Sequence, residues 1–106
     1  MEETQAHFHL DDLEARRREG ADPWLEFLRV PSLRAGLYVL PAGGVDLQTP
    51  HAEDEIYVIL SGRGRFTADG EDRAVSAHDV LFVAKEVEHR FHAIEEDLSV
   101  AVVFAR

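Results

Sequence analysis

Residues 43–66 read GGVDLQTPHAEDEIYVILSGRGRF, and this stretch decides the fold. It contains a run of β-branched and aromatic residues, EIYVIL, with an acidic turn before it and two glycines after it. Such a run between turn-forming residues predicts a β-strand. Side chains alternate between the two faces of a strand, and here both sets are apolar, Tyr57 and Ile59 on one face and their neighbours on the other. Both faces of this strand therefore need to be covered.

The same kind of run recurs along most of the chain. After Pro31, the runs GLYVL, RFTA, VLFVA, HRFHAI and LSVAVVFA alternate with turn-rich segments and predict roughly seven or eight strands. Asp69 and Gly70 lie between two such runs and predict a hairpin, because a type I′ turn needs positive φ at both central residues. No helix-length pattern separates the strands. The expected fold class is therefore all-β and antiparallel, a sandwich or a small barrel.

Residues 1–29 have a different character. The segment LDDLEARRREG has acidic residues at its start, basic residues near its end and Gly20 after them, which predicts a short helix. Asp22 followed by Pro23 is typical of a second helix start, with apolar side chains behind it that can lie on the sheet. We therefore expect a helical N-terminal segment, residues 1–29, that packs on the barrel or on a partner subunit, and a β-barrel domain of residues 30–106.

Length and composition exclude several classes of protein. The 106 residues fit one domain, and 45% hydrophobic with 30% charged residues is typical of a soluble globular protein. The net charge of −10 repels polyanions, so nucleic acids and anionic membranes are excluded as partners. Cysteine is absent, so any metal must be held by nitrogen or oxygen. No apolar run approaches the roughly 20 residues of a membrane helix, and the N-terminus lacks the order of a secretory signal, so we expect a cytoplasmic protein.

Two stretches hold residues suited to metal chemistry, the one quoted above and HDVLFVAKEVEHRFHAI at residues 78–94. His51 and Glu55 lie just before and at the start of one strand, and His89 starts a later one. Inward side chains of neighbouring strands converge in a closed barrel, so these three residues can meet at its mouth. Two imidazoles and a carboxylate can hold a divalent metal and leave positions for water or substrate.

At these residues the chain resembles the cupin family, over roughly residues 30–106. Glu55, the six residues IYVILS and Gly62 match the end of the first cupin motif, G-(x)5-H-x-H-(x)3–4-E-(x)6-G, and His51 falls on its second histidine. In the second motif, G-(x)5-P-x-G-(x)2-H-(x)3-N, His89 takes the histidine position. The resemblance implies a cupin-like antiparallel β-barrel, the double-stranded jelly roll, with iron, manganese, nickel or zinc bound at its mouth.

The chain departs from both motifs. Thr49 stands in place of the first histidine, so at most two histidines and one glutamate remain as ligands. Thr49 and Gln48 are candidates for a fourth ligand or for a residue that supports the ligands, and Asp46 and Glu53 are further candidates. Four residues of the second motif also differ from the pattern: His78, Ala84, Glu86 and Ala93.

Other aromatic and histidine residues need an interpretation of their own. Tyr57 and Phe91 share the strand parity of the expected ligands, so they line a ligand pocket or pack in the core. His92 has the opposite parity and is expected to point away from the site. His7 and His9 have the spacing of a histidine pair, but they lie in the helical N-terminal segment, and we interpret them as solvated or packing residues.

Three functional hypotheses follow, and the sequence leaves all of them open. In the first, the chain is an enzyme whose single metal ion activates dioxygen, as in a small-molecule oxygenase, or polarises a small substrate, as in an isomerase or lyase. The alternative is a non-catalytic module that binds or senses a small ligand at a weak or vestigial metal site. A third hypothesis is a dimeric structural domain.

The apolar outer faces of the strands bear on oligomeric state. One face of each strand lines the barrel interior, and the other needs either the N-terminal segment or a second subunit to cover it. We expect a homodimer. The alternative is a monomer in which residues 1–30 cover the whole outer face.

Overall fold

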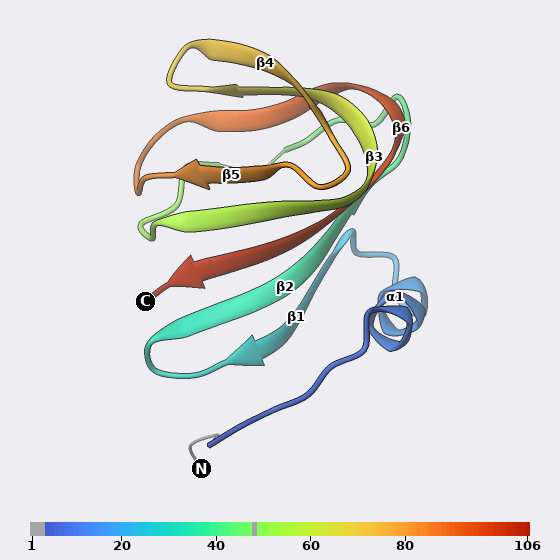
Figure 1. The fold of residues 1–106 in the computed structure, drawn as a ribbon, viewed down its shortest axis with the longest axis vertical. Coiled ribbons are helices and arrows are strands. Elements are labelled where there is room, and N and C mark those ends of the chain that lie inside the picture. The colour runs from blue at the N-terminus through green and yellow to red at the C-terminus, as the bar shows by residue number, and fades with distance from the viewer. Residues whose placement is uncertain (1–3, 48) are drawn as a thin grey trace.

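The computed structural model describes residues 4–47 and 49–106, and within them one helix precedes a six-stranded sheet that curls into a barrel (Figure 1). The elements are α1 (Leu10–Arg18), β1 (Trp24–Arg29), β2 (Leu33–Leu40), β3 (Glu55–Ala68), β4 (Glu71–Ser76), β5 (Val80–Val83) and β6 (His89–Ala105). The strand order is β1-β2-β6-β3-β4, with β5 also paired to β3, and every pair is antiparallel. The all-β jelly-roll prediction is confirmed.

The N-terminal segment contains the predicted helix and one strand that was not predicted. In α1, Asp11 and Asp12 lie in the first turn and three arginines in the last, as the macrodipole favours. The N-cap is His9, whose Nδ1 accepts from the backbone N–H of Asp11 at 3.3 Å. The prediction of a second helix after Pro23 is wrong. Residues 24–29 form β1, because the aromatic side chains Trp24 and Phe27 suit a strand and the free edge of β2 offers hydrogen-bond partners.

The described residues form fewer strands than predicted because two strands are unusually long. β3 has 14 residues and β6 has 17, and each runs through a segment that the sequence suggested would be a break. Three register shifts between them mark β-bulges, which bend both strands and curl the sheet (Figure 1). Gly62 lies in this region with φ +90°, and a Cβ there would lie 2.1 Å from the Asp97 carbonyl oxygen. Glycine is therefore required at the bend.

The hairpin between β3 and β4 is as predicted. Asp69 and Gly70 have φ of 51° and 78°, so both central residues are left-handed.

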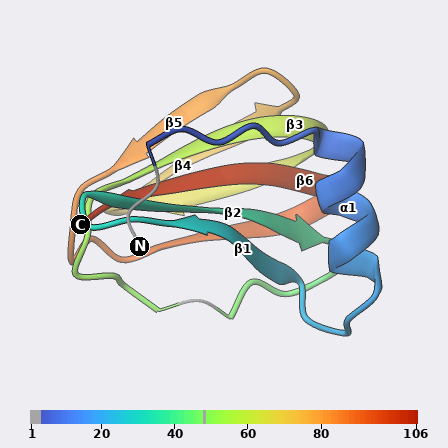
Figure 2. The ribbon, with the colours of Figure 1, turned by 90° about the horizontal axis from the view of Figure 1, so that it is seen from below.

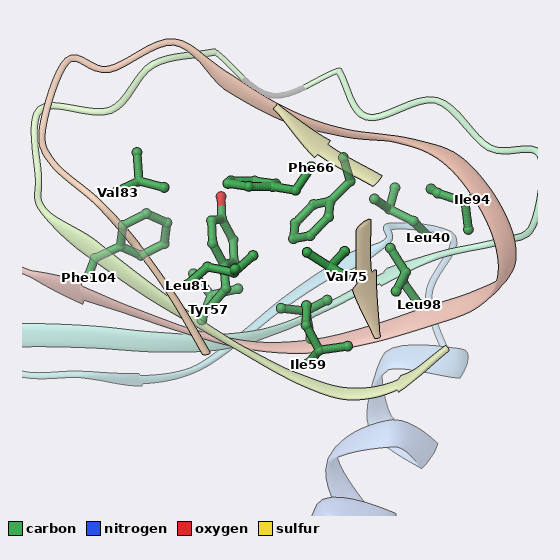
Figure 3. Packing of buried hydrophobic residues seen from close by; sticks show 13 residues of the cluster. Leu40, Tyr57, Ile59, Phe66, Val75, Leu81, Val83, Ile94, Leu98 and Phe104 are labelled. Atoms are coloured by element: carbon green, nitrogen blue, oxygen red, sulfur yellow. The ribbon is translucent and has the colours of Figure 1, made fainter. Parts of the chain in front are cut away.

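The barrel interior holds a single apolar cluster, drawn in Figure 3. Tyr57 and Ile59 point inward from β3, at 1% and 0% exposure, which confirms the predicted parity. Phe91 is also buried there, and its ring packs against Phe66 and Tyr57 with centroids 4.7 and 5.1 Å away. The cluster comprises Leu40, Tyr57, Ile59, Phe66, Val75, Leu81, Val83, Phe91, Ile94, Leu98, Val100, Val102 and Phe104.

The helix covers only part of the outer face. α1 lies at one end of the sheet, where it contacts β1 and β2 (Figure 2). Leu13 is buried there, and Ser99 Oγ donates to Glu14 Oε1 at 3.2 Å. Large apolar side chains farther along the outer face remain exposed: Ile56, Val80, Phe82 and Val103. Among the described residues, no helix has the length and apolarity needed to span a membrane.

The exposed row gives a prediction about assembly. Ile56 pairs with both Phe82 and Val103 across neighbouring strands, so the three form one continuous apolar row without a charged residue. We predict a homodimer through this row, with a mass by light scattering twice that of the chain. Phe82→Ser should weaken the dimer by about 2 kcal/mol per copy, because the phenylalanine ring is no longer buried at the interface. We expect the single-chain mass for this variant. Leu47→Ser, which also replaces a large apolar side chain with serine but at an exposed site outside the row, is the control. A single-chain mass for the unchanged protein at micromolar concentration contradicts the prediction.

The bend gives a second prediction. Gly62→Ala forces a methyl group onto the Asp97 backbone and should lower the free energy of unfolding in urea by about 3 kcal/mol. Gly70→Ala is the matched control, because Gly70 also has positive φ but no atom lies within 4 Å of its Cβ position. It should cost only about 1 kcal/mol. Equal losses for the two variants would show that the close approach at Gly62 is unimportant.

Candidate metal centre

The three expected ligands come from different parts of the barrel. Glu55 is the first residue of β3, His89 is the first residue of β6, and His51 lies in the loop that leads into β3. In the β3–β6 ladder, Glu55 pairs with Phe104 while His89 pairs with Ala68 at the far end of β3. The curl of the strands across the interior therefore brings these two side chains together.

The three side chains do converge. Each offers a ligand atom, and these atoms all lie within 4.8 Å of one another. Glu55 Oε1 is 2.7 Å from His89 Nε2, and both side chains are only 1% exposed. His51 is half-buried, with its ring centroid 5.9 Å from that of His89. Metal–ligand distances of about 2.1 Å place neighbouring ligand atoms about 3 Å apart, so small side-chain rotations would suffice.

The hydrogen bonds of His89 define its protonation. Nδ1 lies 2.7 Å from the Val87 carbonyl oxygen, which only accepts, so Nδ1 carries a proton. Nε2 lies close to both Glu55 Oε1 and the Tyr57 hydroxyl, the latter at 3.0 Å, so the protonated ring donates from Nε2 to Glu55 and the neutral ring offers its lone pair at the same point. Burial lowers the pKa of His89, but the hydrogen bonds to Glu55 and Val87 outweigh it, and the pKa lies above its usual value. The site therefore favours a cation, a proton or a metal ion, between nitrogen and carboxylate.

Glu55 provides the test of whether a metal fits. Its Oε2 is buried, and no other described residue donates a hydrogen bond to it. An unpaired carboxylate oxygen in a barrel interior costs free energy unless a cation satisfies it. Two imidazoles and a carboxylate are also a donor set that divalent transition metals accept. The residues therefore fit the metal that the resemblance implies.

The other candidate ligands have different roles or positions. Asp46 is buried, accepts from the Tyr38 hydroxyl at 2.7 Å and from the Phe91 backbone N–H at 2.9 Å, and lies outside the convergent group. Glu53 is held by Arg34, whose hydrogen bonds lower the pKa of the Glu53 carboxyl. Thr49 is exposed, and Gln48 lies outside the described residues.

The loop that carries His51 is fixed at several points. The carbonyl oxygen of His51 accepts from the Glu86 N–H at 2.7 Å, and Asp54 Oδ1 accepts from the Lys85 N–H at 2.8 Å. Asp46 ties the beginning of the loop to β6 through Phe91. Backbone and carboxylate contacts thus position His51. These contacts join residues that are far apart in the sequence, so no sequence motif predicts them.

Two cavities flank the site. One of about 240 Å³ has four aromatic side chains in its lining, Trp24, Tyr38, Tyr57 and Phe104, and also includes His51, so Tyr57 does line a pocket. Another of about 500 Å³ includes Thr49 and His89. Phe91 packs within the core instead.

The first cavity is lined in part by residues whose role in a pocket the sequence did not predict, Arg34 and Trp24. Arg34 stacks 3.8 Å over the Phe104 ring and pairs with Glu53 at 2.8 Å. Trp24, from the unpredicted β1, lies so close over Gly36 that a Cβ there would be 2.1 Å from the indole. The alternation of Arg34, Gly36 and Tyr38 along β2 is the signal that could have identified this face.

The remaining histidines lie away from the site. His92 bonds Asp72 and Thr67 on the outer side, at 3.0 and 2.9 Å, as its parity predicted. His78 lies in a turn. His7 and His9 are exposed.

Comparison with known proteins identifies the family. The family model described as Cupin domain matches residues 36–105. The chain belongs to the cupin family. Uncharacterized protein SCO3923 of Streptomyces coelicolor is 46% identical over 98 residues, covering 92% of this chain and 93% of the relative.

Two solved structures show the same fold. A cupin protein from Bacteroides fragilis is 25% identical, with a TM-score of 0.66 over 82% of this chain and 79% of that one. The DMSP lyase DddQ from Ruegeria pomeroyi is 23% identical, with a TM-score of 0.71 over 82% of this chain and 50% of that one. At these identities the likeness concerns the barrel, since one fold serves many functions.

Departures from the second cupin motif coincide with strained backbone. His78, Glu86 and Ala93 have φ of 80°, 66° and 46°. The motif has glycine or asparagine at these positions, the residues that adopt positive φ most readily. The barrel has kept the backbone conformation while the sequence has changed.

This strain gives a prediction at Glu86, an exposed residue of the turn that ends at Val87. Glu86→Gly should raise the free energy of unfolding by about 0.5 to 1 kcal/mol, measured in urea, because glycine removes the left-handed strain. Glu86→Ala is the control, since it removes the charge but keeps the Cβ atom. A gain of the same size in both variants would attribute the effect to charge.

Proposed function

We propose that this cupin is a metal-dependent enzyme in which His51, Glu55 and His89 hold one divalent ion, drawn from iron, manganese, nickel and zinc, and that it acts on a small oxygen-bearing molecule. The observation that carries the proposal is the buried, unpaired Glu55 Oε2 on a carboxylate whose other oxygen lies 2.7 Å from His89 Nε2. Structural core positions rarely retain such a group, because burial without a partner is costly.

The chain's own residues have separable tasks in this proposal. The Val87 carbonyl fixes the proton on His89 Nδ1 and so directs Nε2 to the site. The Tyr57 hydroxyl, 3.0 Å from that nitrogen, is placed to hold or release a proton at the edge of the site. A bound ion would polarise a substrate oxygen as a Lewis acid. Proton transfer by Tyr57 next to a polarised oxygen favours isomerase or lyase chemistry.

A second candidate is supported by the donor set itself. Two histidines and a carboxylate are typical of non-haem iron(II) oxygenases. In that case the metal supplies the reactivity toward dioxygen, and the barrel orients the substrate and excludes water.

A non-catalytic binding module is the alternative. It is supported by Thr49, which is exposed where the family motif has a histidine, so that three protein ligands remain. Fewer ligands hold a metal less tightly. Turnover separates this alternative from the enzyme.

Metal binding is tested by elemental analysis of protein purified without metal-affinity chromatography or added metal. We expect a near-stoichiometric transition metal. After removal of the metal, cobalt(II) titration by calorimetry should show affinity at least about 100-fold weaker in His89→Ala, since even residues behind the ligands are worth 10- to 100-fold. His92→Ala is the matched control on the outer face. His51→Ala, at a half-buried position, serves if His89→Ala does not fold. No metal retained and none taken up would refute the proposal.

Turnover is tested with the metal-loaded protein and a panel of diols, thiols and small keto acids. Deuterium exchange from solvent into substrate, followed by NMR, reports proton transfer, and an oxygen electrode reports oxygenase activity. Tyr57→Phe should keep the metal and lower kcat for proton transfer about 100-fold. Oxygen uptake that Tyr57→Phe leaves unchanged favours the oxygenase. No turnover by either readout favours the binding module.

A further inference from the structure

The aromatic cavity next to His51 carries an inference about the molecule that occupies it. We propose that this cavity binds the ring of an uncharged aromatic molecule whose hydroxyl or carbonyl oxygen lies toward His51 and Tyr57. That the molecule is a substrate, rather than a bound ligand alone, rests on the proposed function.

The size of the cavity fits one ring with small substituents. Its volume is about 240 Å³. An apolar protein cavity of about 150 Å³ accommodates benzene. The difference leaves room for a substituent of a few atoms.

Its walls favour an aromatic ring. Trp24, Tyr38 and Phe104 line it, and the Trp24 ring meets the other two edge-to-face, at centroid distances of 6.4 and 6.0 Å. A ligand ring can extend this set of edge-to-face contacts, which add to the effect of apolar burial. Tyr38 presents its ring, because its hydroxyl is bound to Asp46 at 2.7 Å and burial raises its pKa.

Its charges favour a neutral ligand. Arg34 is the cationic residue of the lining, and it is already paired with Glu53 at 2.8 Å and with Glu26 at 3.3 Å. An anionic ligand would therefore find no uncompensated positive charge on the wall. A cationic ligand would lie beside Arg34, whose guanidinium already takes the cation–π position over Phe104 at 3.8 Å. Asp22 is the acidic residue of the lining, and its Oδ1 already accepts from the Trp24 backbone N–H at 2.9 Å. Either charge would also lose its hydration in an apolar cavity.

Part of this wall lies outside the residues that the cupin family model matches. Trp24 lies on β1, and the cupin family match begins at residue 36. Gly36 makes room for the indole, since a Cβ there would overlap it. The aromatic side of the cavity thus depends on a strand outside the matched domain.

Trp24 also supplies the reporter, because it is the single tryptophan of the chain. Its fluorescence, excited at 295 nm and corrected for absorbance, is titrated in metal-free protein with 4-nitrobenzyl alcohol, 4-nitrobenzoate and 4-nitrobenzylammonium, which share a quenching ring and differ in charge. We expect saturable quenching by the alcohol with a Kd on the order of 1 mM or tighter, and at least tenfold weaker binding of both ions. Cyclohexylmethanol should displace the alcohol only at severalfold higher concentration.

A pair of variants locates the binding. Val102→Phe puts a ring into the cavity and should abolish saturable quenching. Val45→Phe makes the same change at an exposed position that does not line the cavity, and should leave it intact. If Val102→Phe does not fold by circular dichroism, calorimetry with Trp24→Leu takes its place, and the affinity for the alcohol should fall severalfold.

Non-saturable quenching by all three probes, equal or tighter binding of either ion, equal displacement by cyclohexylmethanol, or binding that survives the cavity variant would overturn the inference. Because these titrations use no metal, they are independent of cobalt(II) uptake. Metal uptake without aromatic binding refutes this inference alone, and aromatic binding without metal uptake refutes the metal-dependent function alone.

Discussion

The contact between Glu55 and His89 depends on the curvature of two strands. The two residues lie at opposite ends of the β3–β6 ladder, yet Glu55 Oε1 is 2.7 Å from His89 Nε2. A flat ladder would hold them many residues apart, so the bulges around Gly62 are what make the site. The bend, the closed interior and the convergence of the ligands are therefore one structural feature with a single cause.

Burying this pair is costly, and the surrounding residues limit that cost. The Val87 carbonyl accepts a hydrogen bond from His89 Nδ1, and the Tyr57 hydroxyl lies within hydrogen-bond distance of Nε2. Among the described residues, Glu55 Oε2 has no hydrogen-bond partner. A core built for stability alone would place hydrocarbon there, because replacing a buried ion pair with apolar residues often stabilises a protein. Stability and activity trade against one another at such positions.

Much of the fold and the ligand set could be predicted from the sequence. The parity of EIYVIL placed Tyr57 and Ile59 inside, and the spacing from His51 to Gly62 pointed to the ligands that the barrel brings together. The errors have physical reasons. β1 was expected as a helix because Asp22-Pro23 is a local helix signal, and the open edge of β2 overrides it. The predicted number of strands was too high, because the glycine-rich and acidic segments at the bulges resemble turns in the sequence although the strand pairing continues through them. Arg34 and Asp46 were not assigned their roles because their partners lie on other elements, and such pairings follow from the closed barrel.

The seating of Trp24 on Gly36 couples two positions that lie on different strands. An indole at position 24 requires that position 36 carry no side chain, and any larger residue at 36 would expel the ring from its place between Tyr38 and Phe104. Relatives of this protein are thus expected to exchange the two residues together during divergence, and the pair marks which of them have kept an aromatic chamber behind the histidines.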